Sequence, residues 1–183
     1  MNNNSILVLA TKSITINIFL KEIINELSQS CNVILGSSDI DELKDFNQQK
    51  ISFIFPIKFW HLFNPFYIFY CVIINRKKIK QNNINCIFLN TPLAAHIIRT
   101  SCIFLNIKIV YFVHGYRFHP NGNILSNFIF FYIEKILSFF TSAYININNI
   151  DFDITKKFFK KKSLYVNGVG INLKIKKNTF INF

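Results

Sequence analysis

A histidine followed by a glycine stands directly after an apolar stretch of the chain, in Val113-His114-Gly115. A neutral imidazole at such a place can hydrogen-bond a hydroxyl or a phosphate, and it can take part in proton transfer. The glycine would let a ligand or a backbone segment approach closely, because it has no Cβ. We take His114 as the candidate catalytic residue, although its position is equally compatible with a hydrogen-bonded structural histidine.

Other polar residues also follow apolar segments that the sequence predicts to be strands. In an open α/β sheet, ligands bind in the crevice beyond the carboxyl ends of the strands. The segments that satisfy this rule are Thr11–Ser13, Gly36–Asp39, Asn90–Pro92, His114–His119 and Asn148–Asp151. Within them, the predicted substrate-binding residues are Thr11, Lys12, Asn90, Thr91, Gly115 and Arg117.

Glu134 is the most unusual carboxylate of the sequence, because it lies within an aromatic helical segment, Tyr132-Ile133-Glu134-Lys135. An acid in apolar surroundings must be paired or must face water. It therefore either faces a cleft, where it would bind substrate, or pairs with a nearby lysine, and we favour the cleft. His61 and His96 also lie in apolar helical surroundings, and we expect both to be structural.

Apolar segments of strand length alternate with amphipathic helical segments over the whole chain. The predicted strands are 6–10, 32–36, 51–55, 86–89, 108–113, 143–147 and 163–166. The predicted helices are 16–27, a helix from Asn64-Pro65 to the basic run 76–80, then 92–103, 126–140 and about 151–161. This alternation predicts an α/β fold with a single Rossmann-like, doubly wound, mainly parallel sheet and helices on both faces.

The composition predicts a packed domain with excess positive charge. Of the 183 residues, 51% are hydrophobic and 16% are charged, and 21 Lys and Arg against 9 Asp and Glu give a net charge of +12. Such a balance can attract phosphate, nucleic acid or an anionic membrane surface. Because the chain is rich in Phe, Ile, Asn and Lys, we attribute most of the charge to the compositional drift of an A+T-rich genome. The lysines form no nucleic-acid motif, so we expect no nucleic-acid partner.

Several kinds of site and segment are disfavoured by the sequence. The four cysteines, Cys31, Cys71, Cys86 and Cys102, lack the spacing of a zinc site or a disulfide framework. No dinucleotide-binding, P-loop or nucleophile-elbow motif occurs, which argues against dehydrogenases, P-loop enzymes and α/β-hydrolases. The N-terminus is not a signal peptide. The apolar stretches 59–75 and 124–145 contain polar or charged residues that disfavour a membrane-spanning helix.

Five short motifs follow one another along the chain. They are Asn90-Thr91-Pro92, Val113-His114-Gly115-Tyr116, Tyr132-Ile133-Glu134-Lys135, Ile147-Asn148-Asn149-Ile150-Asp151-Phe152 and Tyr165-Val166-Asn167-Gly168-Val169-Gly170-Ile171-Asn172. In this order they resemble the N-terminal domain of glycosyltransferase family 4. The resemblance is strongest to the bacterial branch that builds capsular, exopolysaccharide or lipid-linked oligosaccharide chains, and it is densest from Cys86 to Asn172.

The resemblance implies a GT-B fold, in which two Rossmann-like domains face each other across a cleft. The first domain would hold the acceptor, a lipid-linked sugar, and the second would bind the nucleotide-sugar donor, a co-substrate. Transfer would retain the anomeric configuration, and the reaction would need no cofactor and no bound metal. The family's His-Gly histidine maps onto His114 and its helix glutamate onto Glu134, and Gly168 joins the predicted substrate-binding residues.

The resemblance divides the chain into a family 4-like N-terminal domain, 1–172, and a basic tail, 173–183, at the expected interdomain linker. The C-terminal donor domain is absent from this sequence, so we expect no turnover from the chain alone and a separate donor-domain chain as a partner. The expected location is the cytoplasm, peripheral to the inner face of the membrane. The alternatives are a non-catalytic binding module or gene remnant with membrane affinity, and an unrelated Rossmann-like ligand binder.

Overall fold

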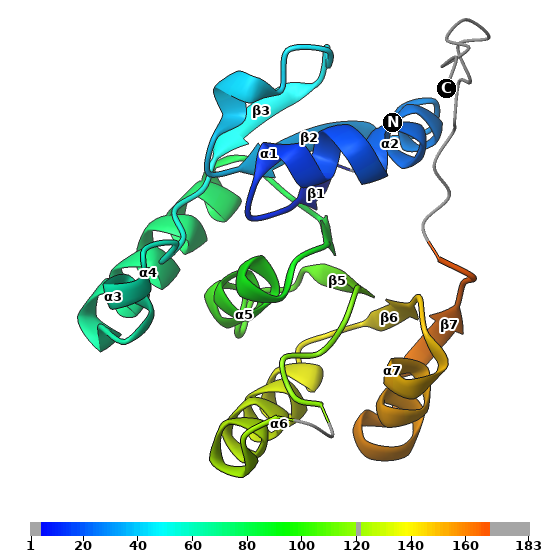
Figure 1. The fold of residues 1–183 in the computed structure, drawn as a ribbon. Coiled ribbons are helices and arrows are strands. Elements are labelled where there is room, and N and C mark those ends of the chain that lie inside the picture. Colours follow the sequence, from blue (N-terminus) through cyan, green and yellow to red (C-terminus); the bar gives the residue numbers. More distant parts are fainter. Residues whose placement is uncertain (1–4, 120–121, 169–183) are drawn as a thin grey trace, which may run out of the picture.

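The computed structural model describes residues 5–119 and 122–168, and one sheet forms its centre (Figure 1). The seven strands are all parallel, in the order β3-β2-β1-β4-β5-β6-β7. They are β1 Ser5–Leu9, β2 Asn32–Ser37, β3 Gln49–Ser52, β4 Cys86–Leu89, β5 Lys108–Val113, β6 Ala143–Asn146 and β7 Lys162–Tyr165. The predicted Rossmann-like sheet is thereby confirmed.

Helices connect the successive strands except β2 and β3, as the alternating pattern predicted. They are α1 Ser13–Thr15, α2 Lys21–Ser28, α3 Phe59–Leu62, α4 Pro65–Gln81, α5 Pro92–Ser101, α6 Ile124–Ser138 and α7 Asn149–Ile154, with π-helical turns at Ile16–Leu20 and Thr155–Phe159 and a 3₁₀ turn at Ile40–Glu42. The helix predicted at Asn64-Pro65 is α4. Its first turn is capped by the Asn64 side chain, which accepts a hydrogen bond from the Tyr67 N–H at 3.1 Å.

Helices α6 and α7 begin two residues earlier than the sequence pattern predicted. An asparagine caps each of them: the Asn123 side chain accepts from the Ser126 N–H, and the Asn148 side chain accepts from the Asp151 N–H. A side-chain oxygen at this position satisfies one of the N–H groups that the first helical turn leaves free. Each helix therefore starts directly after its asparagine.

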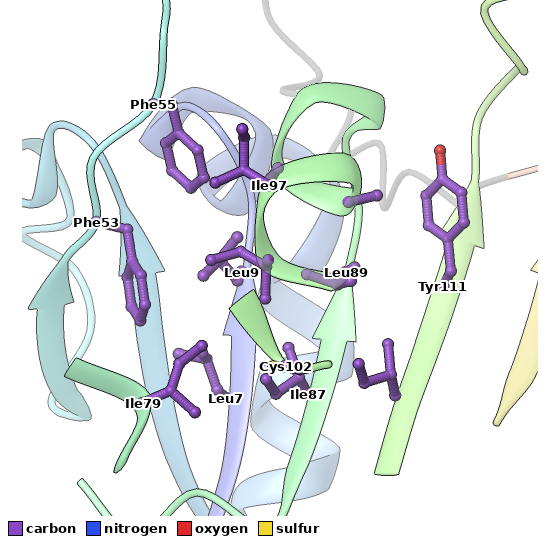
Figure 2. Close-up of a cluster of buried hydrophobic side chains, with 14 of the residues drawn as sticks. Leu7, Leu9, Phe53, Phe55, Ile79, Ile87, Leu89, Ile97, Cys102 and Tyr111 are labelled. Atoms are coloured by element: carbon purple, nitrogen blue, oxygen red, sulfur yellow. The ribbon is translucent and has the colours of Figure 1, made fainter. Parts of the chain in front are cut away.

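The two faces of the sheet are covered unequally. Helices α4, α5, α6 and α7 lie on one face, and α1 and α2 lie on the other, over β1 and β2 (Figure 1). The larger core lies beneath α4 and α5 and is represented by Leu9, Leu89 and Ile97 in Figure 2. The smaller core includes Val8 and Leu20, beneath α1 and α2. Strand β1 is thus buried on both faces, as a central parallel strand should be.

Towards β7, the face that carries α1 and α2 has no covering helix among the described residues. Its side chains form two rows across the strands, Phe88–Val110–Ala143 and Phe112–Ile145–Leu164. Leu164 is 58% exposed, and Phe88, Val110 and Ile145 are half-buried. Since parallel sheets are normally covered on both faces, we call these two rows the open half-face.

Asn75, in the middle of α4, ties this helix to the chain beyond β3. Its side chain is fully buried, accepts a hydrogen bond from the Ile54 N–H at 3.0 Å and donates one to the Ile54 carbonyl at 2.7 Å. Strand β3 ends at Ser52, so the sheet does not bond this part of the backbone. The asparagine satisfies both polar groups of Ile54 and holds α4 in place.

We predict that Asn75→Ala lowers the free energy of unfolding by about 2–4 kcal/mol, because each buried polar group left without a partner costs about 1–3 kcal/mol. Urea denaturation followed by circular dichroism measures this change. Gln81→Ala, an exposed residue of the same helix, is the matched control, and its effect should stay within about 0.5 kcal/mol. Equal denaturation midpoints for the two variants would contradict the assigned role of Asn75.

Candidate functional site

The carboxyl ends of β1 and β4 lie side by side, where the strand order reverses. The chain continues from β1 to β2 on one side of β1, and β4 lies on its other side. Open α/β sheets bind ligands at such a switch point. Two predicted binding residues meet here, since the Thr11 and Thr91 hydroxyls are 2.6 Å apart and the Thr11 N–H donates to Thr91 Oγ1 at 2.9 Å.

Three polar side chains at this edge, two of them buried and His114 half-buried, have buried atoms without a hydrogen-bond partner among the described residues. Asn90 follows β4 and is fully buried, and neither its amide nitrogen nor its carbonyl oxygen is bonded. Ser37 Oγ, at the end of β2, and His114 Nε2, beyond β5, are unpaired as well. Because buried polar groups are almost always hydrogen-bonded, these atoms make the edge a candidate ligand site, although unpaired buried atoms also occur elsewhere, on Tyr111, Tyr144 and Ser163. Ser37 lies in a segment that the strand-end rule selected, but its side chain was not predicted.

His114 is uncharged at neutral pH. Its ring meets the Phe112 ring edge-on at a centroid distance of 4.6 Å, and the Phe19 ring lies at 6.3 Å. Burial lowers the pKa of this imidazole below its ordinary value of 6.5. A neutral imidazole donates a hydrogen bond from one nitrogen and accepts one at the other, which suits a hydroxyl group as its partner.

Lys12 is paired within the protein. Its Nζ lies 3.2 Å from Asp39 Oδ2, and Asp39 Oδ1 accepts a hydrogen bond from the Ser13 N–H at 2.8 Å. Burial acts to raise the pKa of the Asp39 carboxyl, but the Ser13 N–H and Lys12 outweigh it and hold this pKa below its usual value. The ion pair ties the loop after β1 to the loop after β2, and it neutralises the lysine.

The loop after β5 turns at Gly115 and borders a cavity between α6 and α7. Gly115 has a φ of +142°, a conformation that side chains other than glycine rarely adopt. The cavity has a volume of about 750 Å³, and Asn148 and Asp151, beyond β6, contribute to its polar lining. Their segment was expected at the carboxyl edge, but neither side chain was predicted as a site residue. Besides the strand-end position, the sequence signal was the Asn-x-x-Asp spacing of a helix cap.

Arg117 is separated from His114, although the two are three residues apart in the sequence. Its exposed guanidinium lies over the Phe130 ring of α6, at 4.5 Å from the ring centroid. It borders a groove that α4, α5 and α6 line on the opposite face of the sheet from His114. A ligand bound at the switch point would therefore not contact both His114 and Arg117.

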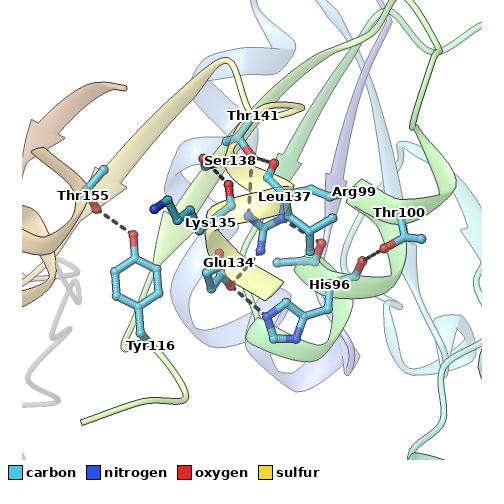
Figure 3. Close-up of polar contacts among 11 residues, drawn as sticks. His96, Arg99, Thr100, Tyr116, Glu134, Lys135, Leu137, Ser138, Thr141 and Thr155 are labelled. Carbon is cyan, nitrogen blue, oxygen red and sulfur yellow. Dashed lines mark hydrogen bonds and ion pairs between the residues drawn. The ribbon is translucent and has the colours of Figure 1, made fainter. Parts of the chain in front are cut away.

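Glu134 does not face a cleft, and that expectation was wrong. The residue is 2% exposed and lies between α5 and α6. Its Oε1 accepts a hydrogen bond from Arg99 Nη2 at 2.8 Å and lies 2.8 Å from His96 Nε2 (Figure 3). Arg99 is fully buried, and its guanidinium stacks over the Tyr111 ring at 4.7 Å. The partners come from a neighbouring helix, and His96 has the structural role expected for it.

The buried pair stays ionised because its partners outweigh the cost of burial. Burial acts to raise the pKa of the Glu134 carboxyl, but Arg99 and His96 lower it to about 2. Burial acts to lower the pKa of the Arg99 guanidinium, and Glu134 raises it above its usual range. The charged pair fixes α6 to α5. Glu134 and His114 lie on opposite faces of the sheet, so the fold does not bring these two predicted residues together.

The last predicted site residue, Gly168, is also the last residue described. It has a φ of +78°, which favours glycine. The remainder of its motif, 169–172, and the tail 173–183 lie outside the described residues. Within 5–119 and 122–168, no three His, Cys, Asp or Glu side chains are grouped so as to hold a metal ion.

Several solved structures share this fold. A glycosyltransferase from Rickettsia africae superposes with a TM-score of 0.63 at 17% identity, over 91% of this chain and 43% of its own. MurG from Acinetobacter baumannii superposes with a TM-score of 0.64 at 13% identity, over 93% of this chain and 47% of its own. Sucrose-phosphate synthase from Thermosynechococcus elongatus superposes with a TM-score of 0.64 at 10% identity, over 89% of this chain and 47% of its own. The sequence itself matches no protein-family model and no curated protein.

The chain has the fold of one half of a GT-B protein. It spans less than half the length of each of these three structures. The expected architecture is thus confirmed. At such identities the likeness concerns the fold, and membership of family 4 remains a prediction.

We predict that Glu134→Gln destabilises the protein by about 3–5 kcal/mol, because it leaves the Arg99 guanidinium buried without a counter-charge. The double variant Arg99→Met/Glu134→Leu should recover most of the loss, since an apolar pair of similar volume avoids the buried charges. Glu26→Gln, in exposed surroundings on α2, is the control. Chemical denaturation at pH 7 measures all three, and a single variant as stable as the control would refute the role of the pair.

The same pair predicts a loss of stability in acid. The pKa of Glu134 is about 2 in the folded protein against an ordinary value of 4.5, so its contribution is fully present above pH 4.5. As the pH falls from 4.5 towards 2, the unfolded chain binds the proton first and stability declines. We expect this decline to be shallower in the Arg99→Met/Glu134→Leu variant than in the wild type, as measured by denaturation midpoints across the pH range.

Proposed function

We propose that the chain is the acceptor-side domain of a retaining family 4 glycosyltransferase that acts in bacterial surface polysaccharide or lipid-linked glycan synthesis. The observation that carries the proposal is the set of unpaired buried polar atoms on Ser37, Asn90 and His114 at the carboxyl edge of the sheet. Two of the similar structures are named as a glycosyltransferase and a sucrose-phosphate synthase. The ordered motifs from Asn90 to Gly168 support the family 4 assignment.

The polar groups of the switch point suit an uncharged ligand that is rich in hydroxyls. The hydroxyls of Thr11 and Thr91, the Asn90 amide and the neutral His114 ring can all donate and accept hydrogen bonds. The Lys12 ammonium, in the loop after β1, is already paired with Asp39. A sugar ring presents hydroxyls that also donate and accept. We therefore propose that this edge binds the sugar that is transferred or the sugar that accepts it. His114 would hydrogen-bond one of its hydroxyls or take the proton of that hydroxyl.

A second domain would bind the nucleotide-sugar donor and close the cleft. The similar structures support this arrangement, because this chain covers only 43% and 47% of the two bacterial proteins' lengths. The open half-face adds support, since its exposed Leu164 and half-buried Ile145 offer an apolar surface on which further polypeptide can pack. The expected acceptor is a lipid-linked sugar, and Gly115 would allow it to approach the loop after β5.

Sugar transfer should require both this chain and a donor-binding polypeptide. We suggest combining the chain with a polypeptide that supplies a donor-binding domain. Transfer from labelled nucleotide-sugars to polyprenyl-linked acceptors would then be measured. His114→Ala should reduce the rate by about 10²- to 10⁴-fold if its imidazole moves a proton. His61→Ala is the control and should leave the rate unchanged. The His61 ring lies in the helical layer, where it stacks on the Tyr67 ring at a centroid distance of 4.0 Å.

The pH profile separates this role from a structural one. The pKa of His114 lies below 6.5, so its imidazole is mainly neutral at pH 6.5 and above. Because the neutral ring is the form that takes a proton, the rate should decline only below pH 6.5. Sugar transfer by this chain alone, or full activity in His114→Ala with its partner present, would contradict the proposal. Acceptor binding without transfer under any pairing would favour a non-catalytic binding module.

A further inference from the structure

The cavity between α6 and α7 lies beside the switch point but is not part of it. Gly115 and Asn148, in the loops after β5 and β6, both line the cavity, so it reaches the carboxyl edge of the sheet. Its volume of about 750 Å³ lies within the range of roughly 300–1,000 Å³ that is usual for small-molecule sites. Such sites combine apolar walls with a few fixed polar groups. We call it the α6–α7 cavity.

Among the described residues that line the α6–α7 cavity, Asp151 supplies the one carboxylate. The residue is 6% exposed. Its Oδ2 accepts a hydrogen bond from Asn148 Nδ2 at 2.6 Å, and the Tyr116 N–H also donates to the carboxylate. Burial raises the pKa of this carboxyl above its ordinary value, and the two donors oppose the rise only in part.

The absence of a cation distinguishes Asp151 from Glu134, the other buried acid of the described residues. Glu134 is paired with Arg99 at 2.8 Å. No Lys, Arg or His nitrogen in the described part of the chain lies within 4.0 Å of the Asp151 carboxylate. A buried carboxylate is costly unless hydrogen bonds satisfy it, and its two oxygens can accept about four. A donor that belongs to a ligand can therefore still bind to Asp151.

Four aromatic rings in mutual contact form a wall of the cavity. Tyr116 and Phe118 stack at a centroid distance of 5.0 Å, and Phe131 meets Phe118 edge-on at 5.5 Å and Phe158 edge-on at 5.3 Å. These contacts fix the orientation of each ring, so the wall is formed before a ligand binds. Phe131 belongs to α6, in one of the two apolar stretches that the sequence disfavoured as membrane spans. None of the described helices is long and apolar enough to cross a membrane.

The loop after β5 is bonded to the elements on both sides of the cavity. Asn127 of α6 donates from Nδ2 to the His119 carbonyl at 2.7 Å and accepts at Oδ1 from the His119 N–H at 3.2 Å. The hydroxyls of Tyr116 and Thr155, the residue after α7, are 2.6 Å apart (Figure 3). The loop therefore holds Gly115 and Tyr116 in defined positions against the cavity.

We propose that the α6–α7 cavity binds the sugar ring of the acceptor, and that the Asp151 carboxylate accepts a hydrogen bond from one of its hydroxyls. This assignment rests on the proposed sugar transfer, and it leaves the switch point at Thr11, Asn90 and His114 to the transferred sugar. The C–H groups of a sugar ring pack on aromatic rings, whose faces are negative. Its hydroxyls form strong hydrogen bonds with a carboxylate.

Other ligand classes suit the cavity less well. An alkyl or prenyl chain would cover the Asp151 carboxylate without supplying a hydrogen bond, which is costly. A phosphate would meet the negative charge of Asp151 with no cation beside it, so the phosphates of a lipid-linked acceptor should stay outside the cavity. A cationic ligand would be attracted by Asp151 but repelled by the net charge of +12 of the whole chain.

Alkyl glycosides test the assignment without catalysis. We suggest titrating the full 183-residue protein with octyl glucoside, octyl galactoside and octyl N-acetylglucosaminide below their micelle concentrations. Calorimetry and saturation-transfer NMR would measure the binding. At least one glycoside should bind, and its ring protons should receive more saturation than its alkyl protons. Octanol, octyl sulfate and octylammonium carry the same chain without a sugar, and they should bind about tenfold more weakly or not at all.

Matched variants locate the contact. Asp151→Asn should weaken glycoside binding by roughly tenfold or more, because a hydrogen bond to a charged group is lost. Asp153→Asn, at an exposed acid of the same helix, is its control. Phe128→Ala removes an exposed ring that lines the cavity and should weaken binding about two- to tenfold. Phe139→Ala, beyond the other end of α6, should have no effect. Circular dichroism melting curves verify that each variant is folded.

Three results would overturn the assignment. One is that none of the three glycosides binds. Another is a folded Asp151→Asn variant that binds them like the wild type. The third is that octanol, octyl sulfate or octylammonium binds as tightly as the glycosides, which would assign the cavity to an apolar chain, an anion or an amine.

These failures can be told apart from a failure of the proposed sugar transfer. Once transfer is reconstituted with a donor-binding polypeptide, Asp151→Asn should raise the KM for the acceptor about tenfold, whereas His114→Ala should lower kcat. Transfer in which Asp151→Asn leaves this KM unchanged would refute the cavity assignment alone. Glycoside binding that depends on Asp151, without transfer under any pairing, would refute the transfer alone.

Discussion

The buried pair of Arg99 and Glu134 determines how the helical layer is built. A guanidinium with no exposed surface must keep its counter-charge, so α6 has to lie where Glu134 reaches Arg99 of α5. This contact fixes the relative positions of α5 and α6, which both line the groove beside Arg117. It also positions the start of α6, where the loop that begins at His114 ends. The ion pair therefore helps to position both the loop after β5 and the outer surface of the helical layer.

The parallel sheet keeps these two regions apart. All strands end at one edge, where Thr11, Asn90 and His114 gather neutral donors and acceptors. The groove that α5 and α6 line lies on the face of the sheet that carries these helices, and the open half-face lies on the opposite face. The chain therefore carries neutral polar groups at one edge of its sheet and apolar side chains on both faces.

The local sequence pattern was enough to predict the helices and strands, but not the side-chain contacts between different elements. The apolar strands and the Asn64-Pro65 helix start follow from neighbouring residues, so both could be predicted. The contact between Thr11 and Thr91 joins residues 80 positions apart, and only the strand order brings them together. Glu134 illustrates the same limit, since its aromatic neighbours indicated an unusual acid but its partner lies 35 positions upstream on another helix. The caps of α6 and α7 were missed because asparagine is so common here that it carries little positional information.

The distribution of charge is more informative than its amount. The predicted compositional drift concerns the number of lysines and does not determine where the acids lie. Residues 46–150 are 105 of 183, so an even spread would place about five of the nine acids there, whereas this stretch holds one. That one is Glu134, whose carboxylate is buried and neutralised. The one acid of this stretch, which includes α3, α4 and α6, is therefore the buried partner of Arg99 and not a surface carboxylate.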